Sequence, residues 1–245
     1  MTLSLACMCI VEFVGTLLFQ LVGGDADIGA YNGMILAVVI YMTAHASGGV
    51  VNPAVSTCLL AVGEMPVAKW AAYVASQLLG AVAGSLIARI ADPTAHSLGW
   101  AIDGVGHGCV PLSASESQQF LPIFIWEFIG TFMLCATVLT TAVDTPGFGD
   151  LAPFAIGLAV AVNVDTSGSI TGGCYNPARF FGPALAFGCR LQLIWLYFSA
   201  ELLGGLAAAL WHTKLLGGVR RQSTPMLREH ARSGADGVEL SVPTS

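Results

Sequence analysis

Two asparagines in identical contexts, Asn52 and Asn176, are the residues of this 245-residue chain best suited to handle a small polar molecule. Each begins the tripeptide Asn-Pro-Ala, formed by Asn52, Pro53 and Ala54 and again by Asn176, Pro177 and Ala178. A side-chain amide offers two N–H donors and one carbonyl acceptor and carries no charge. Each of the two asparagines can therefore donate a side-chain N–H to the oxygen of another molecule.

Each tripeptide also predicts the start of a helix. Proline suits the first helical turn, and asparagine directly before it is a favourable N-cap. The apolar stretches that follow, 53–62 and 177–187, are too short to cross a bilayer, which takes roughly 20 residues. Both are therefore expected to be half-helices that end inside a membrane.

Arg179 directly follows the second tripeptide. A charged side chain at membrane depth is costly, so it is a candidate functional residue by default. Its guanidinium repels cations and offers hydrogen-bond donors to a neutral solute.

The composition indicates a membrane protein. Hydrophobic residues make up 55% of the chain and charged residues 10%, whereas soluble domains have about 25% charged residues. The sequence lacks the basic cluster with interleaved aromatics that indicates nucleic-acid binding. Its cysteines and histidines lack metal-site spacing, and no nucleophile–base motif stands out, so we expect no metal, no cofactor and no enzymatic activity.

The elements expected around these residues are all helical. Six segments approach the length and apolarity of a spanning helix: 5–23, 31–46, 67–90, 120–143, 151–167 and 191–213. Residues 91–119 form a polar connecting loop, and residues 215–245 are expected to be a disordered tail. We therefore predict an all-α membrane protein with six transmembrane helices and two half-helices.

The chain is also an internal repeat. Residues 12–16 (Glu-Phe-Val-Gly-Thr) match residues 127–131 (Glu-Phe-Ile-Gly-Thr), and the two Asn-Pro-Ala copies are 124 positions apart. The first repeat spans 1–90 and the second 120–214, each with three spans and one half-helix. An odd number of spans per half inverts the second half in the membrane. The two half-helix N-termini are then expected to meet at mid-depth.

The distribution of basic residues predicts the orientation. Lys214 and the tail that follows it contain five of the nine Lys and Arg residues, and Lys69 begins the third span on the same side. Basic residues favour the cytoplasmic side, so both termini are expected in the cytoplasm. The choice between the plasma membrane and an internal, vacuolar-type membrane stays open.

Over residues 5–214 the chain resembles the major intrinsic protein, or aquaporin, family. The resemblance rests on the paired Asn-Pro-Ala motifs, Arg179 and the twinned Glu-x-x-Gly-Thr segments. It implies a homotetrameric channel in lipid that passes water and small neutral solutes (ammonia, hydrogen peroxide, possibly urea) and excludes protons and ions. A glycerol or metalloid facilitator and a non-conducting structural membrane protein are the alternatives.

The resemblance further implies a selectivity filter of Asn32, Val164, Gly173 and Arg179, counted from the two motifs. Gly173 and Val164 resemble the tonoplast and ammonia-conducting branches, from which Asn32 departs. Phe180 and the Tyr197-Phe198 pair depart from the glycerol-facilitator pattern, so water comes first. Family members also use residues matching Glu12 and Glu127 to brace the loops before the half-helices, and Cys174, beside Gly173, is the expected mercurial site.

Overall fold

The computed structural model describes residues 3–23, 29–91, 120–144 and 147–217. Every regular element in these ranges is a helix. The predicted connecting loop, 91–119, and the predicted tail, 215–245, lie almost wholly outside the described residues.

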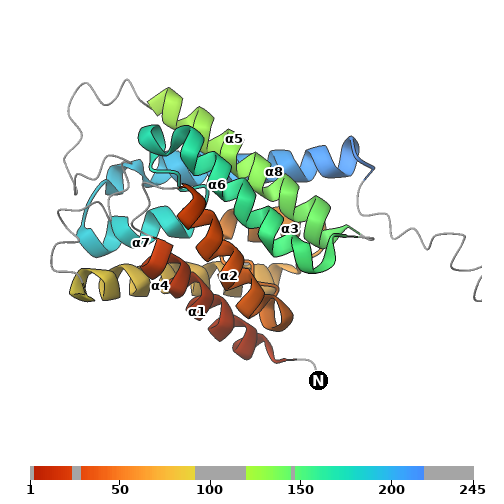
Figure 1. Ribbon diagram of the computed structural model, residues 1–245, viewed down its shortest axis with the longest axis horizontal. Helices are drawn as coiled ribbons and strands as arrows, with labels where there is room; N and C mark the ends of the chain where they lie inside the picture. Colours follow the sequence, from red (N-terminus) through yellow and green to blue (C-terminus); the bar gives the residue numbers. More distant parts are fainter. Residues whose placement is uncertain (1–2, 24–28, 92–119, 145–146, 218–245) are drawn as a thin grey trace, which may run out of the picture.

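The first half contains four helices (Figure 1): α1 (Leu5–Gly23), α2 (Gly29–Ser47), α3 (Pro53–Ala61) and α4 (Val67–Ala91). The second half contains α5 (Phe120–Val138), the π-helical turn η2 (Leu139–Val143), the 3-10 turn η3 (Gly149–Leu151), α6 (Ala152–Thr171), α7 (Pro177–Phe187), the 3-10 turn η4 (Leu191–Leu193) and α8 (Ile194–Lys214). The short helices α3 and α7 are the segments expected to be half-helices.

Five of the described helical segments are long and apolar enough to cross a membrane, namely α1, α4, α5 with η2, η3 with α6, and η4 with α8. Helix α2, with 19 residues, is not among them. It packs along α6 and α1, and its polar residues Asn32, Thr43 and Ser47 are buried.

The helices pack in corresponding pairs in the two halves, α1 against α4 and α5 against α8, and α2 against α6 joins the halves. At the α2–α6 crossing, Gly33 faces Gly157 so closely that a Cβ on either would overlap the other's carbonyl oxygen. Small residues at such crossings let two spanning helices approach backbone to backbone.

Large apolar side chains cover the outer faces of the bundle. Those at least half exposed occur on six helices and include Ile10, Met34, Val38, Leu79, Leu121, Phe154, Leu158 and Leu210. Soluble monomers rarely expose so much contiguous apolar surface. This surface suits contact with lipid tails.

Helix α6 extends four residues beyond the end predicted for its span. The fifth span was expected to end at residue 167, but α6 continues to Thr171. It ends where Gly172 adopts a left-handed conformation with φ 83°. Glycine takes that conformation without steric cost, so Gly172, and not the polar residues before it, stops the helix.

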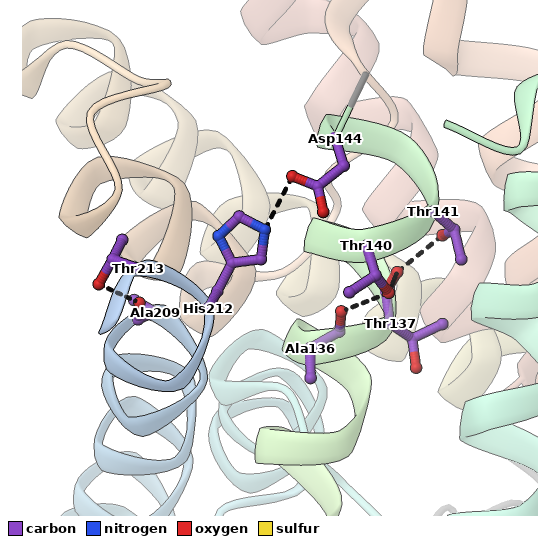
Figure 2. A network of polar contacts seen from close by, with 8 residues as sticks. All are labelled: Ala136, Thr137, Thr140, Thr141, Asp144, Ala209, His212 and Thr213. Carbon is purple, nitrogen blue, oxygen red and sulfur yellow. Dashed lines mark hydrogen bonds and ion pairs between the residues drawn. The ribbon is translucent and has the colours of Figure 1, made fainter. Parts of the chain in front are cut away.

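The turn η2 ends in a part-buried polar contact (Figure 2). The N–H of Asp144 donates to the Leu139 carbonyl over 2.9 Å, which closes the π turn. The Asp144 carboxylate then lies 2.9 Å from Nε2 of His212, a fully buried side chain near the end of α8. This contact fastens the end of η2 to α8.

Replacing His212 with alanine should therefore destabilise the fold. The change removes the partner of Asp144 and leaves space at the α5–α8 junction. We expect a loss of about 1–3 kcal/mol, chiefly from the space left by the fully buried His212 ring, because Asp144 is about one third exposed and can bind water instead. Thermal unfolding in detergent measures this as a lower midpoint.

Thr213→Ala is the matched control, because the Thr213 hydroxyl is exposed and donates only within its own helix, to the Ala209 carbonyl. Its effect should stay within about 0.5 kcal/mol. Equal midpoints for the two variants would contradict a fastening role for His212.

Candidate pore

Both asparagines cap the half-helices they precede. Oδ1 of Asn52 accepts the N–H of Ala54 over 2.8 Å, and Oδ1 of Asn176 accepts the N–H of Ala178 over 3.0 Å. Pro53 and Pro177 occupy the first helical positions. The local sequence therefore starts α3 and α7 as expected for N-cap asparagines.

The same two side chains join the half-helices to each other. Nδ2 of Asn52 donates to the carbonyl of Tyr175, and Nδ2 of Asn176 donates to the carbonyl of Val51, each over 2.9 Å. We call these two bonds the reciprocal lock. A primary amide has two N–H groups, so each asparagine keeps one for another acceptor.

The residues before the asparagines have unusual backbone conformations. Val51 has φ 41° and Tyr175 has φ 48°, in the left-handed region that non-glycine residues rarely occupy. Such conformations persist where the surroundings hold them in place. Here they turn each carbonyl toward the asparagine of the other half.

Glu12, on α1, holds the first of these loops. Its carboxylate accepts the N–H groups of Val50 over 3.0 Å and Val51 over 2.7 Å. It also accepts the Ser47 hydroxyl and the Gln77 amide, over 2.6 and 2.8 Å. A fully buried carboxylate with four donors is well compensated for its loss of water.

Glu127, on α5, occupies the corresponding place in the second half. It accepts the N–H of Cys174 over 3.1 Å and the N–H of Tyr175 over 2.7 Å. The next N–H, that of Asn176, is accepted by Glu201 of α8 over 3.0 Å. Two carboxyl groups thus hold the second loop, where one holds the first.

No sequence motif marked Val51 or Tyr175 as a site residue, although their carbonyls accept the two hydrogen bonds of the reciprocal lock. Gly15 and Gly130 make room for their side chains: a Cβ on Gly15 would lie 2.8 Å from Val51, and one on Gly130 would overlap the Tyr175 ring. The twinned Glu-x-x-Gly-Thr segment carried this signal, because its glycine faces the loop that its glutamate holds.

A cavity of about 590 Å³ leads to the reciprocal lock. Asn52, Asn176 and Cys174 line one part of it, and Glu64, Lys69 and Asp144 line another. Between them the walls are mostly apolar, with side chains such as Phe19, Ile40, Leu134 and Val160. A largely apolar passage with a few convergent polar groups is typical of a small-molecule site.

Arg179 lies in the first turn of α7, three residues after Asn176. Its Nη1 donates to the Gly23 carbonyl over 2.8 Å, and its guanidinium carbon lies 5.4 Å from the centre of the Phe19 ring. The side chain is buried, and α1 fixes its position.

The other residues of the expected filter form two contacts. A Cβ on Gly23 would lie 3.4 Å from Oδ1 of Asn32 and 3.5 Å from Nη1 of Arg179, so these two polar groups flank the same point. A Cβ built on Gly173 would lie 2.9 Å from Cγ2 of Val164, so Gly173 packs closely against Val164. None of the four lines the 590 Å³ cavity.

The Asn32 amide is fully buried, and neither its oxygen nor its nitrogen has a hydrogen-bond partner among the described residues. Buried polar groups are nearly always paired, so this amide calls for an explanation.

The described residues contain no group of three His, Cys, Asp or Glu side chains that could hold a metal ion.

Comparison with known proteins identifies the family. A family model described as "Major intrinsic protein" matches residues 2–212. The chain is 34% identical to mouse Aquaporin-8 over 220 residues, covering 85% of this chain and 82% of that protein. It is 38% identical to a probable aquaporin of rice, TIP3-2, over 191 residues, covering 77% of this chain and 67% of the relative.

The fold matches as well. The crystal structure of the aquaglyceroporin from Plasmodium falciparum superposes with a TM-score of 0.72 at 21% identity, covering 92% of this chain and all of that one. This match confirms the predicted all-α, aquaporin-like fold. The chain belongs to the major intrinsic protein family, the aquaporins, and is an integral membrane channel protein, not an enzyme.

Proposed function

We propose that this protein is a passive water channel that also passes small neutral solutes such as ammonia, hydrogen peroxide and urea, and excludes protons and ions. The reciprocal lock carries the proposal. It joins two half-helices by their N-termini beside a cavity and leaves each asparagine one N–H for a passing oxygen.

Electrostatics at the lock would exclude cations. The N-terminus of each helix carries a partial charge of about +0.5, and α3 and α7 bring two such ends together. In a medium of low dielectric constant this is a substantial barrier to a cation. A neutral solute meets no comparable barrier.

The same groups would interrupt proton transfer along a file of waters. A water that accepts an N–H from both Asn52 and Asn176 has its oxygen lone pairs engaged. It cannot then accept a hydrogen bond from the water behind it, which a proton relay needs. Water would pass at this point while protons would not.

Asn32, Val164, Gly173 and Arg179 are the proposed filter. The unpaired amide of Asn32 and the guanidinium of Arg179 flank Gly23, where they would supply an acceptor and several donors to a polar solute. Val164 and Gly173 supply an apolar, uncharged side. This combination favours a small solute with hydrogen-bonding groups and no charge.

Glycerol is a weaker candidate substrate. The position directly after Arg179 holds Phe180, whose buried ring stacks on Tyr197 with 3.9 Å between centroids. The Tyr197 hydroxyl in turn donates to the Thr171 carbonyl over 2.7 Å. Phe180 stands where a glycerol facilitator is expected to have an acidic side chain, and Tyr197 begins the pair that stands where it is expected to have a proline and an aliphatic residue. The joined half-helices and Arg179 weigh against a non-conducting role.

Both termini are proposed to face the cytoplasm. Cys189, just after α7, is disulfide-bonded, and disulfides persist in oxidising compartments outside the cytosol. Helix α7 starts at mid-depth, and Cys189 places its C-terminal end on the outer side of the membrane. Helix α8 then crosses the membrane from the outer side and ends in the cytoplasm. Assembly as a homotetramer in plasma or vacuolar-type membranes is proposed from family membership alone.

Substituting Val164 tests the filter and the proposed function together. Val164→His should add a bulky polar ring beside Gly173 and reduce ammonia permeability about tenfold, while water permeability changes less. Stopped-flow light scattering of proteoliposomes measures water and glycerol, and an internal pH dye reports ammonia entry. Wild type should pass water and ammonia rapidly and glycerol slowly.

Val164→Thr is the matched control, because threonine keeps the shape of valine. It should leave ammonia entry near the wild-type rate. Unchanged ammonia entry in Val164→His would remove Val164 from the filter, and wild-type water permeability equal to that of empty liposomes would refute the channel proposal itself.

Cys174 should make the channel sensitive to mercurials. Cys174 is one of the residues that line the cavity beside the lock, so a mercury adduct there would obstruct the path. We expect mercuric chloride to abolish most of the water permeability of wild type and little of that of Cys174→Ser.

Cys7→Ser is the control, since Cys7 is a free cysteine exposed on α1. It should remain as sensitive as wild type. If Cys174→Ser were inhibited equally, the blocking thiol would have to lie elsewhere.

A further inference from the structure

A second carboxyl group lies beside Glu127 in the bundle interior. Glu127 of α5 and Glu201 of α8 are both fully buried and lie within hydrogen-bonding reach of each other. Two ionised carboxylates in contact repel strongly in a medium of low dielectric constant. The channel mechanism described above does not account for this pair.

The hydrogen bonds of the two groups differ. Both oxygens of Glu127 accept backbone N–H groups, Oε1 from Cys174 and Oε2 from Tyr175. Glu201 accepts the N–H of Asn176 through Oε1, but its Oε2 has no donor among the described residues. An oxygen without a donor is the one that can itself carry a hydrogen.

The position of Glu201 has a counterpart in the first half of the chain. There the repeat mate of Glu201 is Gln77, whose Nε2–H donates to Glu12 over 2.8 Å. The second half has an oxygen where the first has an amide nitrogen. A hydrogen atom on that oxygen restores the same donor–acceptor contact.

We propose that the Glu127–Glu201 pair holds a single proton on Oε2 of Glu201, which donates to the Glu127 carboxylate and makes Glu201 a neutral positioning residue for Asn176. Glu201 then makes in the second half the contact that Gln77 makes in the first, a hydrogen bond from one spanning helix to the loop-holding glutamate of another. In addition, Glu201 accepts the N–H of Asn176.

The surrounding charges agree with one negative charge here. The titratable groups facing the pair are Cys174 and Tyr175 of the loop, Tyr197 of α8 and Arg179 of α7. Arg179 is the cation of this set. A single carboxylate balances it, whereas two would leave a net charge buried in the bundle.

Infrared spectroscopy tests the proton directly. The carbonyl stretch of a protonated carboxylic acid is absent from carboxylates and distinct from amides. The wild-type minus Glu201→Gln difference spectrum at neutral pH should contain one such band. This measurement is independent of transport, so it stands even if the proposed solutes are wrong.

Gln77→Glu is the matched variant in the first half, because it creates the same pair with Glu12. It should add an acid carbonyl band. Glu201→Gln, which keeps a donor toward Glu127, should retain the thermal stability of wild type, whereas Glu201→Ala should lose stability because the Asn176 N–H loses its acceptor.

Loss of the acid band in Glu201→Gln together with retained stability would support the proposal. A difference spectrum without an acid band, or a Glu201→Gln variant as unstable as Glu201→Ala, would overturn it, since Glu201 would then be ionised and its charge required.

Discussion

The backbone of two loops has to be satisfied where lipid supplies no hydrogen bonds. Unpaired N–H groups at that depth cost several kcal/mol each, so irregular segments survive only if protein groups pair with them. Glu12 supplies this pairing for Val50 and Val51, and Glu127 supplies it for Cys174 and Tyr175. The half-helices, the lock and the cavity all depend on these two buried carboxylates.

Once the two carboxylates hold the loops, the reciprocal lock follows from the internal repeat of the chain. Val51 and Tyr175 take equivalent left-handed conformations, and each presents its carbonyl to the asparagine of the other half. One amide side chain therefore caps its own helix, binds the opposite loop and keeps an N–H for the pore. A neutral group with three roles suits a site that has to bind water without attracting ions.

Much of this was predictable because the chain repeats itself. The two Asn-Pro-Ala motifs predicted α3 and α7, and the apolar runs predicted the long helices to within a few residues. The family comparison and the fold match confirm the family and the fold class. The filter residues remain a prediction drawn from the family resemblance.

Other features depended on contacts between distant segments, which periodicity does not report. The extension of α6 to Thr171 depends on where one glycine turns left-handed. The pairing of His212 with Asp144 joins residues 68 positions apart across two helices. The contact of Glu127 with Glu201 depends on the packing of α5 against α8, which the sequence pattern does not report. The repeat did show that Glu201 occupies the position at which the first half has Gln77.

The central claim is that water passes the lock and protons do not, and both fluxes can be measured in one preparation of proteoliposomes. Stopped-flow light scattering gives water permeability, and an enclosed pH-sensitive dye gives proton entry under a pH gradient. The account predicts water permeability far above that of empty liposomes with a proton leak equal to theirs. Water flow no faster than in empty liposomes, or a proton leak that rises with the amount of protein, would contradict it.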